Sequence, residues 1–128
     1  MPTNTVLTER PERAAPRPAA SVTWDVSATP LLTPSLRALL DDFLIFVQHG
    51  SQDAVAMTEI RGFHDPEEDT EQIIVRQWTP LSAPAASAYL EALGQRVEAW
   101  MDTLAPEAKT LFLERIAFQL RRGDHARL

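Results

Sequence analysis

The chain has 128 residues, of which 45% are hydrophobic and 23% are charged, a composition typical of one ordinary globular domain. It contains no cysteine, which excludes a disulfide framework, a thiolate zinc site and a thiol nucleophile. Its net charge of −6 makes nucleic acid and anionic lipid poor ligands for the average surface. With neither a basic leader nor an apolar run long enough for a bilayer, the sequence predicts a cytoplasmic protein without membrane insertion.

Proline is concentrated at the beginning of the chain, among alanine, serine, threonine and arginine. Prolines at this density remove amide donors and fix backbone angles that helices cannot use. We therefore expect residues 1–30 to form a flexible or partner-bound arm. Residues 31–122 are expected to form a single globular domain, and residues 123–128 a frayed tail.

The end of this arm carries an alternating apolar pattern. Val22, Trp24 and Val26 alternate with polar residues, so the three apolar side chains would share one side of an extended segment. The pattern predicts an N-terminal edge strand over residues 21–27. A tryptophan in such a strand favours a contact centred on its large ring.

Two segments have the helical spacing of apolar residues. The first begins at a first-turn proline and ends before a glycine, and it predicts a helix over residues 34–49. The second stripe predicts a helix over residues 83–103, with Ser82 available as the N-cap. Gly94 costs this helix about 1 kcal/mol relative to alanine, so we expect another backbone to approach closely there.

Two runs rich in β-branched and aromatic residues follow the first helix. They cover residues 54–63 and 71–79 and are separated by a polar link, which predicts an antiparallel hairpin with a long acidic tip. Gly62, near the end of the first run, is interpreted as the site of a β-bulge.

The C-terminal region begins with Pro106, which favours a short helix through Glu114. Beyond it, Ile116, Phe118 and Leu120 alternate as in a strand, although the same region also has helical spacing. We choose a strand over residues 115–121, because an isolated hairpin is only marginally stable.

These elements predict an α+β fold, in which a small antiparallel sheet packs against the two long helices. The alternative is a mainly helical protein with one projecting hairpin. In the second hairpin strand, Ile73 and Val75 share one face, while Ile74 and Trp78 share the other. Apolar side chains on both faces would leave surface to cover, which favours a homodimer.

The charge is distributed unevenly along the chain. Residues 35–110 carry five basic and thirteen acidic groups, whereas residues 111–128 carry four basic and two acidic groups. We expect a small acidic accessory or regulatory protein, without enzymatic activity or cofactor, that binds a protein partner or itself. Binding would use the N-terminal arm and an apolar sheet and helix surface. The predicted partner-binding residues are Val22, Trp24, Val26, Arg121 and Arg122.

The acidic loop 64–71 supports an alternative function, a small ligand-binding or divalent-metal-dependent hydrolase domain. Clustered carboxylates beside one imidazole suit hard divalent cations or zinc. The calcium-loop pattern fails when Asp65 is its first ligand, because Thr70 and Arg76 stand where glycine and glutamate are needed. In this alternative the candidate ligands are His64, Asp65, Glu67, Glu68 and Asp69.

Overall fold

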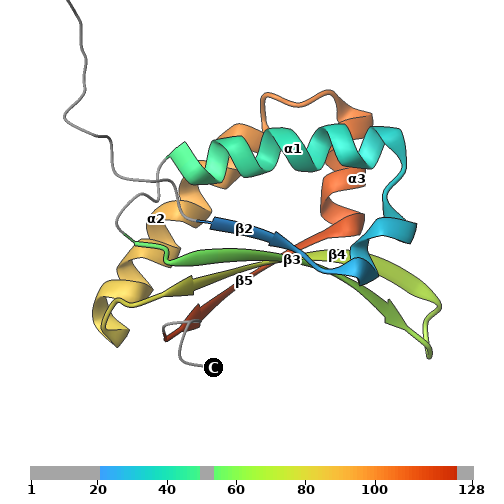
Figure 1. The fold of residues 1–128 in the computed structure, drawn as a ribbon. Helices are drawn as coiled ribbons and strands as arrows, with labels where there is room; N and C mark the ends of the chain where they lie inside the picture. Colours follow the sequence, from blue (N-terminus) through green and yellow to red (C-terminus); the bar gives the residue numbers. More distant parts are fainter. Residues whose placement is uncertain (1–20, 50–53, 124–128) are drawn as a thin grey trace, which may run out of the picture.

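The computed structural model describes residues 21–49 and 54–123, and these form a four-stranded sheet with the helices on one of its faces (Figure 1). The expectations for residues 1–20 of the arm and for residues 124–128 of the tail lie outside the described residues. The elements in chain order are β2 (Ser21–Trp24), η1 (Val26–Leu31), α1 (Pro34–His49), β3 (Met57–Asp65), β4 (Thr70–Thr79), α2 (Ala83–Met101), α3 (Pro106–Arg115) and β5 (Ile116–Arg122).

The strand order in the sheet is β2-β3-β4-β5. Only the central pair, β3 and β4, is antiparallel, whereas β2 runs parallel to β3 and β5 runs parallel to β4. The α+β class is therefore confirmed and the mainly helical alternative is wrong, but the sheet is mixed rather than wholly antiparallel. The reason is that each outer strand is joined to its neighbour through helices, and such a crossover returns the chain parallel to the strand that it left.

Strand β2 is shorter than the expected segment 21–27. It ends at Trp24 because the Asp25 side chain accepts a hydrogen bond from the backbone N–H of Ser27 at 3.0 Å and begins the 3-10 helix η1. A side-chain bond of this kind competes with the ladder of a sheet. Val26 therefore leaves the alternating pattern and is 80% exposed.

The hairpin strands are longer toward the tip than expected. The ladder continues to the pair Asp65 and Thr70, so the turn itself is only residues 66–69, and Asp69 within it has a φ of 54°. The predicted bulge at Gly62 is wrong, because Gly62 pairs regularly with Ile73. Glycine is needed there for space, since a Cβ atom would lie 2.2 Å from the backbone oxygen of Ser27.

The helices match the sequence prediction closely. α1 has the expected bounds, and its first turn is capped by the Thr33 hydroxyl, which accepts from the Leu36 N–H at 3.2 Å. α2 ends at Met101 rather than at residue 103, because the next residues form turns that lead into Pro106. None of the described helices combines the length and the apolar character needed to cross a membrane.

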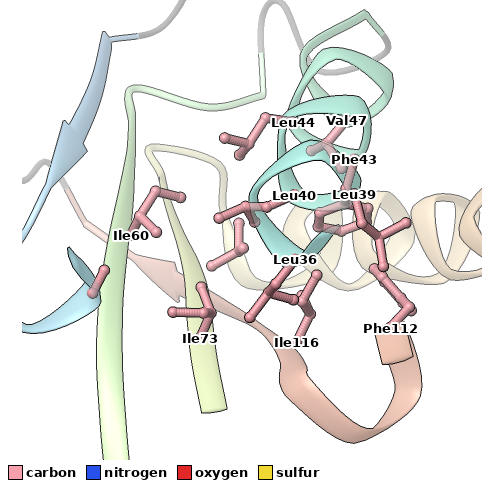
Figure 2. Close-up of a cluster of buried hydrophobic side chains, with 12 residues drawn as sticks. Leu36, Leu39, Leu40, Phe43, Leu44, Val47, Ile60, Ile73, Phe112 and Ile116 are labelled. Carbon is pink, nitrogen blue, oxygen red and sulfur yellow. The ribbon is translucent and has the colours of Figure 1, made fainter. Parts of the chain in front are cut away.

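The core lies between α1 and the sheet, with α3 closing one end (Figure 2). Phe43 is its centre, with ring centroids 5.0 Å from Phe112, 5.5 Å from Trp100 and 6.5 Å from Phe118. The α1 side chains that face the sheet are Leu36, Leu39, Leu40, Phe43, Leu44 and Val47. Their sheet partners in the same cluster include Ile60, Ile73, Val75 and Ile116.

The expectation that a backbone approaches Gly94 is wrong. No atom lies within 4 Å of a Cβ built on this residue, so the position faces open space. Gly94 instead lines an apolar hollow of about 230 Å³ between α2, α3 and β5, with Leu93, Val97 and Phe118 among its other walls.

Candidate functional site

The described helices lie on one side of the sheet, and none of them covers the other side (Figure 1). Side chains alternate between the two sides of a strand, and Ile60, Ile73 and Val75 point into the core. Their chain neighbours therefore point to the other side, which we call the open face. It comprises three rows of register partners: Thr23, Glu59, Arg76 and Gln119; Arg61, Ile74 and Ala117; and Met57, Trp78 and Arg121.

The central row of the open face is a hydrogen-bonded polar network. Arg76 lies between Glu59 of β3 and Gln119 of β5, and its register partners are these two residues. The Arg76 Nε donates to the Gln119 Oε1 at 3.0 Å, and its Nη1 donates to the Glu59 Oε1 at 3.5 Å. The Arg61 Nη1 donates to the other Glu59 oxygen at 3.4 Å, so one carboxylate holds two guanidinium groups.

Apolar side chains flank this polar row on both sides. Ile74 lies in the next row toward the hairpin tip, and Trp78 lies beside Met57 in the row toward the other end of the sheet. Phe63 lies two residues beyond Arg61 in β3, on the same side of the sheet, and is 48% exposed. The open face therefore combines apolar and charged side chains, and on β4 the charged Arg76 lies between the apolar Ile74 and Trp78.

The predicted partner-binding residues are not brought together by the fold. Val22 and Trp24 lie in β2, whereas Arg121 and Arg122 lie in β5, and these strands form opposite edges of the sheet. Val26 lies in η1, outside the sheet, and its side chain is exposed.

Among these predicted residues, Arg121 belongs to the open face. The side chain of Arg122 faces the other side and donates from its Nε to the backbone oxygen of Leu81 at 3.2 Å.

Trp24 lies at the sheet edge on the helix side and is 38% exposed. The guanidinium of Arg37, from α1, lies 4.4 Å from the Trp24 ring centroid, and its Nε also donates to Asp41 at 3.1 Å. A cation over an indole ring is an attractive contact. Part of the Trp24 surface is thus used within the domain itself.

The acidic loop does not gather its side chains into a metal site. Among the described residues, no three histidine or carboxylate side chains converge on a point where an ion could be held. The Asp65 Oδ1 accepts from the Glu67 N–H at 2.9 Å, and the Asp69 carboxylate contacts the His64 Nε2 at 3.0 Å. These local bonds shape the turn, and they give the metal-dependent alternative no supporting geometry.

The contact with Asp69 also changes the proton affinity of His64. The hydrogen bond that the Asp69 carboxylate accepts from the His64 ring raises the pKa of His64 above 6.5, and the nearby charges of Asp69, Glu71 and Asp65 act in the same direction. Both side chains are well exposed, at 50% for His64 and 92% for Asp69. The interaction therefore affects a local turn at the end of the hairpin and does not involve the core.

The residues that sequence reasoning missed are Glu59, Arg76 and Gln119. The sequence gives the strand alternation, and this already places Ile74 and Trp78 opposite the core residues of β4. It does not give the register, which aligns one residue from each of three strands into a single row.

Compared with known protein families, curated proteins and solved structures, the chain matches none.

Proposed function

We propose that this protein is a non-enzymatic interaction module, which binds another macromolecule through the open face of its sheet. The observation that carries the proposal is that the described helices all cover one side of the sheet (Figure 1). By the strand register, the other side carries Ile74, Trp78 and Phe63. A sheet with apolar side chains on both faces is more stable when both are covered.

The polar network supports this proposal because it holds the charged side chains of the open face in fixed positions. Glu59 and Arg76 are held by hydrogen bonds across strands, and their side chains are only 14% and 19% exposed. Such groups lose little conformational entropy on binding, which favours a specific partner over nonspecific adhesion. The arm before Ser21 stays a predicted second contact, and deleting residues 1–20 tests its contribution separately.

Site-specific photo-crosslinking in the native cell tests the proposal. Ala117 lies on the open face, and Ala92 is an exposed alanine on α2 that serves as the matched control. Replacing each in turn with p-benzoyl-phenylalanine places the same reactive group on either surface.

We expect a discrete crosslinked product from position 117 and only background from position 92, with the companion identified by mass spectrometry of the isolated product. Background crosslinking at both positions would refute the proposal.

A further inference from the structure

We propose that the partner of the open face is an acidic amphipathic helix of another protein, and that Arg76 is its central carboxylate contact. This inference rests on the function proposed above. The three rows of the open face carry Arg61, Arg76 and Arg121 against the single carboxylate of Glu59. The face is therefore net positive, although the whole chain has a net charge of −6.

Arg76 is prepared to receive a carboxylate. Its Nε and Nη1 are oriented by Gln119 and Glu59, while no hydrogen bond from its Nη2 occurs among the described residues. A guanidinium has five N–H donors, so one bond from Nε toward β5 and one from Nη1 toward β3 leave the Nη2 donors for a carboxylate contact. Because the fork is already held in place, this contact needs little further ordering.

The apolar neighbours of Arg76 specify an amphipathic ligand. The rows of Ile74 and Trp78 lie on either side of the central row, about 7 Å away along each strand, since a strand rises about 3.3 Å per residue. A helix repeats its surface positions about every 6 Å, between residue i and residue i+4. One helix can therefore place carboxylates over Arg61 and Arg76 and apolar side chains over Ile74.

The width of the sheet also fits a helix. Four strands at about 4.8 Å spacing present a surface about 14 Å wide between the outer strand axes. A helix with its side chains is about 10 Å across, so one helix covers most of this width.

The chain's own segments outside the described residues do not supply an acidic ligand. Residues 1–20 contain three arginines and two glutamates, with no aromatic residue. Residues 50–53 contain one aspartate, and residues 124–128 contain one aspartate and one arginine. A second copy placed face to face would bring two net positive surfaces together. Charge complementarity therefore favours a separate, acidic protein partner.

A nucleic acid also complements arginine, but it fits the surroundings of the face less well. An extended phosphate backbone would pass beyond the three rows toward the hairpin tip, where Asp65, Glu67 and Glu68 add negative charge. Repulsion of this kind acts over about 8–10 Å in physiological salt. A helix whose carboxylates lie only over Arg61 and Arg76 avoids it.

Two synthetic helical peptides of about 16 residues test the proposal. They share one leucine and alanine stripe, and the positions beside the stripe are glutamate in one and lysine in the other. Fluorescence anisotropy with the full-length protein measures each Kd at low and high salt. We expect the glutamate peptide to bind and the lysine peptide not to bind, with the affinity falling as salt rises.

Arginine variants connect this binding to the open face. Arg76→Gln and Arg61→Gln should each weaken binding of the glutamate peptide by about tenfold, the effect of losing one charged hydrogen bond. Arg115→Gln is the matched control, because Arg115 is exposed at the end of α3 and lies outside the three rows. It should change the Kd by less than about twofold. Circular dichroism and the Tm establish that each variant is folded.

Several results would overturn the inference: no binding of the glutamate peptide, equal binding of the two peptides, or full binding by Arg76→Gln. Tighter, Arg76-dependent binding of a labelled single-stranded oligothymidine would assign the face to nucleic acid, and a crosslinked product made of two copies of this chain would assign it to self-association. If position 117 crosslinks to another protein but the glutamate peptide does not bind, the inference fails and the proposed function stands. Background crosslinking at position 117 removes the proposed function itself.

Discussion

Ser27 and Gly62 are joined by a hydrogen bond, although the whole of α1 lies between them in the chain. The Gly62 N–H donates to the Ser27 hydroxyl oxygen at 2.9 Å, and that hydroxyl in turn donates to the Asp25 carboxylate. A Cβ on Gly62 would lie 2.7 Å from the Ser27 carbonyl carbon, in addition to its overlap with the carbonyl oxygen. This contact fixes η1 against β3 and connects the edge of the sheet to the beginning of α1.

Gly62→Ala should therefore destabilise the protein. The atoms that the new methyl group meets are mostly backbone, which cannot move aside as a flexible side chain can. We expect the free energy of unfolding to fall by about 1–3 kcal/mol, the range for overpacking a closely packed site. Urea unfolding followed by circular dichroism measures it, and an unchanged midpoint would show that the approach of Ser27 to Gly62 is looser than described.

Gly94→Ala is the opposite case on a helix. Nothing lies within 4 Å of the added methyl group, so only helix propensity changes. Replacing glycine by alanine in a helix interior stabilises it by about 1 kcal/mol, and the urea midpoint should rise accordingly. A lower midpoint would mean that the apolar hollow beside Gly94 is filled in solution.

Phe43→Ala should be among the most damaging single substitutions. Phe43 is 1% exposed and contacts three other aromatic rings, so its removal loses buried area and leaves a cavity. We expect a loss of about 3–5 kcal/mol in the free energy of unfolding. Ile45→Ala on the same helix is the control, because Ile45 is 65% exposed and should cost less than about 0.5 kcal/mol. Equal losses for the two variants would contradict the orientation of α1.

The pKa of His64 tests the turn of the hairpin. Asp69 holds it above 6.5, so Asp69→Asn should move the pKa back toward that value, as measured by the NMR shifts of the imidazole protons over a pH series. Because the folded-state pKa is the higher one, the stabilising contribution is fully present below about pH 6.5 and is lost as the pH rises through the folded pKa. An unchanged pKa in Asp69→Asn would place the carboxylate away from the imidazole.

The long helices could be predicted from the sequence because their signals are local. A proline in the first turn and a regular apolar stripe fix the bounds of α1 without reference to the rest of the chain. The order of the strands is a nonlocal property. An alternating pattern does not indicate which strands are neighbours, or whether two neighbours run parallel or antiparallel. That is why the two outer strands, β2 and β5, were predicted but their parallel pairing with β3 and β4 was not.

The two glycines show the same limit at the level of single residues. Gly62 was interpreted as a bulge and Gly94 as a point of close approach, yet the close approach occurs at Gly62. Sequence position alone does not tell which neighbour a glycine meets in space.

The open face was foreseen in part, because Ile74 and Trp78 lie opposite Ile73 and Val75 by simple alternation. Its arginine network required the alignment of β3, β4 and β5.

The junction of α3 and β5 has no connecting loop, since the helix ends at Arg115 and the strand begins at Ile116. A single residue inserted after Arg115 could not be absorbed by a turn and would displace β5 by one position against β4. Successive strand residues point to opposite sides, so Phe118 and Leu120 would turn outward and Gln119 and Arg121 would be forced beneath the helices. This junction should therefore tolerate very few changes in length.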